Sequence, residues 1–110
     1  MKVHLIRKET IEEFARQNAQ SRTSLEEWLT KIKNADWERP ADIQATFRRT
    51  DLLGRSSNRA VFDIAGTSYR MICKYAFGAN QVHLFVCWMG THAEYTKLCD
   101  DNEQYTISFY

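Results

Sequence analysis

The stretch from Val82 to Tyr95 constrains the fold more than any other part of the chain. In an extended strand its side chains alternate between two faces, and both faces are largely apolar, which is typical of a central strand. Gly90 interrupts this apolar run. Thr91 precedes Glu94 by three residues, the spacing of a helix capping box. We therefore expect a buried central strand that passes into a helix at Thr91.

That helix would carry two reactive side chains at its start. His92 lies in the first turn, and Tyr95, three residues later, falls on the same helix face. Strict alternation along the preceding strand puts Trp88 on the face of Val86, and Met89 on the opposite face. An imidazole and a phenol leave the sheet together, so a reactive site is expected there first.

The first half of the chain predicts mostly helices. Residues 2–7 alternate as an edge strand. Two amphipathic segments begin at the capping boxes Thr10–Glu13 and Ser24–Glu27, and together they predict an αα-hairpin. A short helix should run from Pro40 to about Phe47. The segment from Arg48 to Asn58 has no periodicity and is interpreted as an exposed basic loop, a candidate for contacting phosphates.

The second half predicts an antiparallel meander. Arg59–Ala65 and Tyr69–Phe77 alternate as strands, and tight turns join them to each other and to the central strand. The tail from Gln104 to Tyr110 alternates weakly and could form an edge strand or a partner-docking segment. The expected fold class is α+β: a small antiparallel sheet with an N-terminal αα-hairpin packed on one face, in the order β-α-α-β-β-β-α, as one domain over residues 1–110.

Composition excludes several classes of protein. With 110 residues, 44% of them hydrophobic, the chain is large and apolar enough to fold as one globular domain. It has no apolar run approaching the roughly 20 residues of a membrane span and no apolar signal segment, so we expect a cytoplasmic protein with no membrane partner. Its three cysteines form no CxxC pair. No metal and no cofactor is expected.

Charge is distributed unevenly along the chain. Between Arg48 and Lys74 there are six arginines and lysines against two aspartates, whereas from Tyr75 onward one lysine stands against four acidic residues. A basic middle segment favours a polyanionic partner, although a solvated charged face is the simpler alternative.

The basic residues and His92 suggest a phosphate chemistry. Cleavage of RNA by its own 2′-hydroxyl requires a base, an acid and cations that hold the phosphate. Histidine titrates near neutrality, and arginine binds phosphate bidentately. Five side chains can converge on the helix-free face of one antiparallel sheet: Arg59, Arg70, Lys74, His92 and Tyr95. Tyr95 would orient the imidazole or stack on a base.

A structural explanation exists for each of these residues. A histidine at a helix start can be incidental, and Tyr95 can be a core tyrosine with a solvated hydroxyl. Arg70 and Lys74 can serve solubility alone.

Several motifs together resemble the HigB family of bacterial toxins, which have a RelE-like fold. They are Arg59-Ala-Val-Phe-Asp-Ile, Tyr69-Arg-Met-Ile-Cys-Lys and above all Gly90-Thr-His-Ala-Glu-Tyr95. The Ile11-Glu-Glu-Phe segment, the Trp28-Leu helix and Pro40-Ala-Asp-Ile43 match in the same order. The sequence differs from this pattern at Thr96, where many relatives have Asp, and in the Gly66-Thr67-Ser68 turn.

The resemblance implies a type II toxin-antitoxin system. The toxin would be a ribosome-dependent, metal-independent mRNA endonuclease, an mRNA interferase, that cuts translated mRNA in the ribosomal A site. A HigA-type helix-turn-helix antitoxin would neutralise it, and operator DNA would be bound only through that antitoxin. The implied catalytic residues are His92, Arg70, Tyr95 and Lys74, and the implied RNA-binding residues are Arg59, Arg55, Arg48 and Arg49.

Two other functions remain open on sequence grounds. One is a gyrase-inhibiting toxin of the same architecture, similar to the ParE toxins. The other is an RNA-binding module without catalytic activity.

Overall fold

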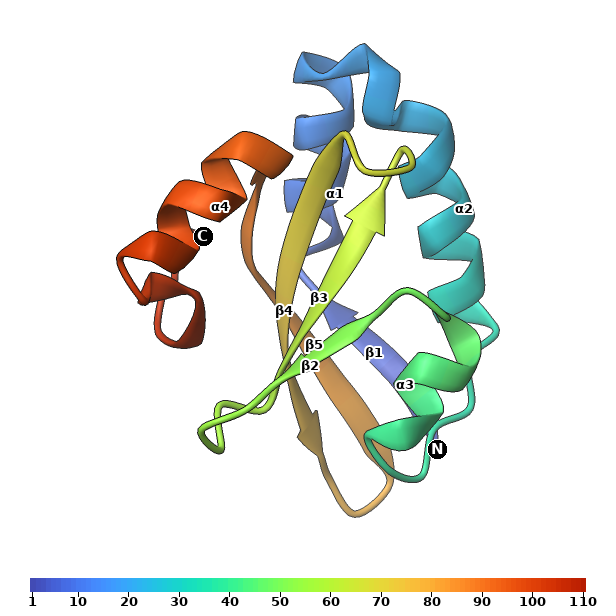
Figure 1. Ribbon diagram of the computed structural model, residues 1–110. Helices are drawn as coiled ribbons and strands as arrows, with labels where there is room; N and C mark the ends of the chain where they lie inside the picture. The colour runs from blue at the N-terminus through green and yellow to red at the C-terminus, as the bar shows by residue number, and fades with distance from the viewer.

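A five-stranded sheet forms the centre of the computed structural model, which describes residues 1–110 (Figure 1). Its strands are β1 (Lys2–Ile6), β2 (Asp51–Leu53), β3 (Arg59–Ile64), β4 (Tyr69–Phe77) and β5 (Gln81–Thr91). In space they follow the order β1-β5-β4-β3-β2. The three junctions from β5 to β2 are antiparallel, but β1 pairs with β5 in parallel. The α+β class is confirmed, and the sheet is mixed rather than purely antiparallel.

One face of the sheet, here called the hairpin face, is covered by the N-terminal helices. These are α1 (Lys8–Gln17), the 3-10 turn η1 (Ala19–Ser21), α2 (Arg22–Lys33) and the short α3 (Ala41–Thr46). A cluster of 16 buried residues joins them to the sheet. Trp28 packs edge-on against Phe62 at 5.4 Å between ring centroids.

No helix is both long and apolar enough to cross a membrane.

The predicted capping boxes do not start α1 and α2. The first helix begins earlier, at Lys8, after Arg7 turns the chain in a left-handed conformation with φ of 62°. Ser24 lies inside the first turns of α2, and its hydroxyl accepts a hydrogen bond from the Ala65 backbone N–H at 2.8 Å. The hydroxyl therefore ties α2 to the end of β3 instead of capping the helix.

The expected order β-α-α-β-β-β-α lacks two elements of the structure. The short helix predicted from Pro40 to Phe47 is present as α3, which the order left out. The predicted loop from Arg48 to Asn58 contains β2, which pairs with β3 at the edge of the sheet. Leu52 and Leu53 are half-buried there, so apolar packing explains why this short segment becomes a strand.

The central strand β5 differs from strict alternation because it contains a bulge. Ile72 of β4 pairs with Trp88, whereas Cys73 pairs with Val86, so Cys87 is an extra residue. Trp88 therefore lies on the face opposite Val86, contrary to the sequence prediction. Gly90 lies within the strand, which passes into the helix at Thr91 as expected. A Cβ atom at Gly90 would lie only 2.5 Å from the Trp88 ring, so glycine is required for this close approach.

The opposite face of the sheet is here called the α4 face. We expected this face to be free of helices, but it is not. Helix α4 (His92–Asp100) and the C-terminal tail (residues 101–110) pack on it. The tail contains a 3-10 turn, η2 (Glu103–Tyr105), and no strand, so the edge-strand alternative is wrong. Its Phe109 N–H donates to the Cys87 carbonyl at 2.8 Å. Figure 1 shows α4 and the C-terminus on one side of the sheet and α2 on the other.

Candidate functional site

The start of α4 presents His92 to solvent. Thr91 and Glu94 form the predicted capping box: Thr91 Oγ1 accepts from the Glu94 N–H at 3.1 Å, and Glu94 Oε1 accepts from the Thr91 N–H at 2.8 Å. The His92 N–H donates to the Ser68 carbonyl at 3.1 Å. This bond fixes the helix start beside the turn before β4, two residues from Arg70. The exposed imidazole therefore stands on a rigid support.

Arg70 is held by two neighbours on the α4 face. Its Nε donates to Asp63 Oδ1 at 3.0 Å, directly across the β3–β4 pair. Its guanidinium carbon lies 4.8 Å from the centroid of the Tyr95 ring. The side chains of Arg70 and Asp63 are only 20% and 14% exposed. Because a guanidinium carries five N–H donors, the pair with Asp63 leaves donors for an anionic ligand.

Asp63 was not among the predicted site residues. A signal for it existed in the sequence, because the Gly66-Thr67-Ser68 turn places residues 63 and 70 opposite each other in an antiparallel pair. Asp63 falls within the strand predicted at Arg59–Ala65, but that prediction did not extend to the register that pairs Asp63 with Arg70.

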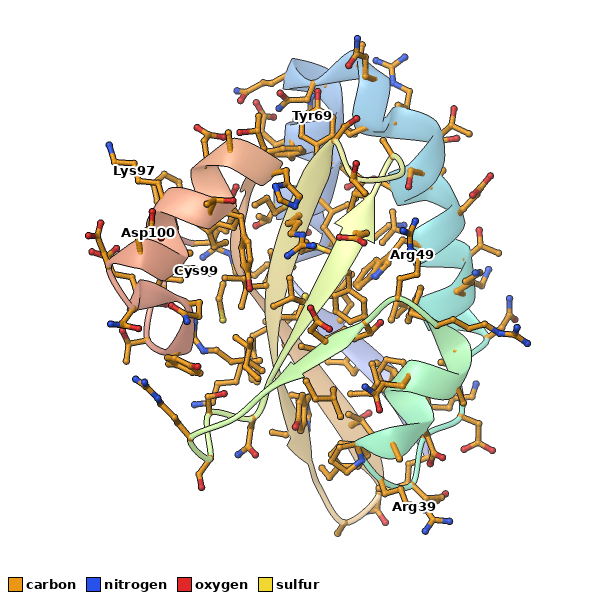
Figure 2. The ribbon with its side chains drawn as sticks, viewed as in Figure 1. Arg39, Arg49, Tyr69, Lys97, Cys99 and Asp100 are labelled. Carbon is orange, nitrogen blue, oxygen red and sulfur yellow. The ribbon has the colours of Figure 1, made fainter.

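The Tyr95 ring packs against the Arg70 guanidinium and is not exposed to solvent. It is buried, with its ring 6.1 Å from that of Trp88. Burial raises the pKa of the Tyr95 phenol well above its ordinary value; the neighbouring Cys99 thiol adds to the shift, and the Arg70 guanidinium opposes it. Figure 2 shows Cys99 on α4. The phenol is therefore protonated at neutral pH and cannot accept a proton as a base.

Lys74 and Arg59 lie at the far end of the same face. Three rows of side chains cross it in register: Asp63 beside Arg70, then Val61 beside Ile72, then Arg59 beside Lys74. The first and third rows are four residues apart, roughly 13 Å along the strands. Apolar side chains of α4 and the tail, including Leu98 and Ile107, pack over the middle row.

The five predicted convergent residues therefore form two groups. His92, Arg70 and Tyr95 gather at the start of α4. Arg59 is buried, and its Nη1 donates to the Gln104 carbonyl of the tail at 3.2 Å. Lys74 is exposed beside it.

The remaining predicted RNA-binding arginines are spread around the sheet. Arg55 is exposed, and its guanidinium lies 4.4 Å from the Tyr105 ring centroid. Arg48 and Arg49 are also exposed. Together with Asp63 they line a hollow of about 240 Å³. Arg49 is labelled in Figure 2, between the sheet and α2. Thr96 donates its hydroxyl to the His92 carbonyl at 3.1 Å. No group of three or more His, Cys, Asp or Glu side chains is arranged to hold a metal ion.

Comparison with known proteins identifies the class to which this fold and site belong. Residues 21–98 match the model of a family described as the RelE-like toxic component of a toxin-antitoxin system. That family is the HigB toxins, and the chain belongs to it. The chain is similar to a protein of Escherichia coli O6:H1 named mRNA interferase HigB, with 29% identity over 96 residues that cover 87% of this chain and 91% of the relative. The family resemblance inferred from the motifs is confirmed.

Proposed function

We propose that this toxin is an endoribonuclease that cleaves mRNA. The observation that carries the proposal is the placement of an exposed His92 beside Arg70, a guanidinium held between Asp63 and Tyr95. The name of the Escherichia coli relative, mRNA interferase, supports the same activity.

The chemistry requires little beyond these residues. A base removes the proton of the RNA 2′-hydroxyl, whose oxygen bonds to the adjacent phosphorus while the bond to the 5′-oxygen breaks and an acid protonates that oxygen. His92 serves as one of these proton-transfer groups. Arg70 stabilises the negative charge that develops on the phosphate oxygens, with Tyr95 and Asp63 holding it in place. This route uses no metal ion.

Membership of a toxin-antitoxin family implies an antitoxin partner. We propose a helix-turn-helix protein of the HigA type, which would also carry the complex to operator DNA. We further propose that cleavage occurs on translated mRNA in the ribosomal A site. Arg48, Arg49 and Arg55 are exposed and favour contact with RNA backbone, including that of the ribosome.

Induction of the toxin without its antitoxin tests the activity. We expect wild type to stop growth and cleave mRNA, and His92→Ala and Arg70→Ala each to lower cleavage by about 100-fold or more. Lys97→Ala is a matched control, because Lys97 points away from the sheet on α4 (Figure 2). Addition of purified ribosomes to toxin and mRNA tests ribosome dependence, which requires cleavage only when ribosomes are present.

Other results would assign a different function. Undiminished toxicity of both site variants would contradict the ribonuclease proposal. DNA damage with intact mRNA would favour a gyrase inhibitor similar to ParE toxins. Harmless expression together with salt-dependent RNA binding would favour an inactive RNA-binding module.

A further inference from the structure

The α4 face contains a cavity that is separate from the His92 and Arg70 group. It has a volume of about 480 Å³ and lies where Ile6, Phe85, Lys74 and Arg59 stand side by side across β1, β5, β4 and β3. Arg7 at the end of β1 and Tyr110 of the tail also line it. No Asp or Glu side chain lines this cavity.

Arg59 is the unusual feature of the cavity. Its side chain is only 6% exposed, yet it forms no ion pair, and its one hydrogen bond goes to a neutral carbonyl, that of Gln104. A charge removed from water is costly unless an opposite charge accompanies it. Lys74 and Arg7 add two more cations at the same cavity. The cavity therefore has the electrostatics of a site for an anion.

Two aromatic side chains complete the cavity. Phe85 and Tyr110 are 39% and 38% exposed, so their rings remain accessible from it. Aromatic rings beside cations are the usual elements of single-stranded nucleic acid sites, where bases stack and phosphates bind arginine or lysine.

We propose that this cavity binds one nucleotide of the substrate RNA, with its phosphate on Arg59 and Lys74 and its base against Phe85 and Tyr110. The inference rests on the proposed function, since it takes RNA as the ligand. The roughly 13 Å along β4 between Arg70 and Lys74 separates this phosphate from the one that is cleaved. Lys74 is thus a residue for binding RNA beside the cleavage site and does not touch the reacting phosphate.

Binding of a 2′-O-methyl oligoribonucleotide tests the site, because this probe has no free 2′-hydroxyl and cannot be cleaved by the proposed route. We expect Lys74→Gln to weaken binding about tenfold and to reduce the slope of log affinity against log salt by about 0.7. Lys97→Gln removes the same charge from the outer side of α4 and should change neither value beyond the effect of net charge (Figure 2). Equal affinities of Lys74→Gln and Lys97→Gln would overturn the proposal.

A second variant tests the stacking. Phe85→Ala should weaken binding of the oligonucleotide by at least about fivefold, because stacking on an aromatic side chain contributes strongly for each base. It should leave binding of inorganic polyphosphate, which has no bases, unchanged. Equal loss for both probes would show that Phe85 only supports the cavity and would overturn base binding there.

The two proposals fail in different ways. If wild type cleaves no mRNA but Lys74→Gln still weakens oligonucleotide binding, the ribonuclease proposal is wrong and the nucleotide site stands. If wild type cleaves mRNA and Lys74→Gln binds the oligonucleotide like wild type, only the nucleotide site is wrong.

Discussion

The two faces of the sheet are built for different tasks. The hairpin face contributes to a cluster of 16 buried residues, all of them hydrophobic, under the N-terminal helices. The α4 face buries a cluster of only six, and this cluster lies between two rows that contain charged side chains. Fold stability is therefore concentrated on one side, which leaves the other side free to hold cations in fixed positions.

The two charged rows also differ from each other. Arg70 is paired with Asp63 and stacked on Tyr95, so its position is fixed before any ligand binds. Arg59 is more deeply buried but has no carboxylate beside it. The first arrangement suits a transition state that needs a preorganised cation, and the second suits an anion that stays bound.

The largest expected effect is on stability at the hairpin face. Phe62→Ala should lower the free energy of unfolding by about 3–5 kcal/mol, because Phe62 is 2% exposed and packs against the rings of Trp28 and Phe47. Ile107→Ala, in the half-buried tail on the α4 face, should cost about 1 kcal/mol. Urea denaturation of both variants measures the difference. Equal losses in the free energy of unfolding would contradict the conclusion that stability is concentrated on the hairpin face.

The close packing of Trp88 on Gly90 predicts a smaller loss of stability with a structural signature. Gly90→Ala should cost about 1–3 kcal/mol, since the new methyl group would meet the indole ring at 2.5 Å and force it to move. Trp88 lies next to Tyr95, so near-ultraviolet circular dichroism should change as well. An unchanged spectrum and an unchanged midpoint would show that the indole moves aside without cost.

Loss of the carboxylate beside Arg70 would test preorganisation. Asp63→Asn should lower cleavage of mRNA about tenfold, because a neutral amide oxygen replaces the charged oxygen that holds Nε, while the free energy of unfolding falls by only about 1–2 kcal/mol. Cleavage assays and denaturation of the same preparation separate the two effects. Full activity in Asp63→Asn would show that the negative charge of Asp63 is not needed to position Arg70.

The smallest expected effect at neutral pH is that of Tyr95→Phe. This variant keeps the ring under Arg70 and removes only a protonated hydroxyl, so cleavage should fall by no more than a few-fold, whereas Tyr95→Ala should lower it about tenfold or more. A large loss in Tyr95→Phe would instead give the hydroxyl a direct part in proton transfer.

The same variant has a signature in alkali. The pKa of Tyr95 is higher in the folded chain than in the unfolded chain, so above pH 10 the unfolded chain binds fewer protons and stability falls as pH rises. Burial raises the pKa values of Cys73, Tyr75 and Tyr110 too, so part of this loss belongs to them. Tyr95→Phe should make the decline of stability above pH 10 shallower, as measured by denaturation at several pH values.

Local patterns predicted the elements whose two faces differ in polarity. In β3 and β4 the alternation of Arg59, Asp63, Arg70 and Lys74 with apolar residues assigned every side chain to the correct face. The capping box at Thr91 was also correct, because β5 ends there and leaves Thr91 extended at the helix start, whereas Thr10 and Ser24 lie inside helices that begin earlier.

Features that depend on distant partners were not predictable in the same way. The bulge at Cys87 lies in a strand that is apolar on both faces, so alternation carries no information about the extra residue. Ser24 could not be assigned its true partner, Ala65, from local spacing. Burial of Arg59 depends on where the tail folds, which its weak alternation did not reveal.

The bulge in β5 has a consequence for how this chain can vary in length. Because Cys87 is the extra residue, its deletion would leave Val86 and Trp88 on the faces that they occupy now and would merely straighten the strand. Deletion of a residue elsewhere in β5, with the bulge kept, would instead reverse the orientation of the side chains on one side of the gap. The Cys87 carbonyl also anchors Phe109, so a chain shortened at this position would keep its sheet but lose a point of attachment for its C-terminal segment.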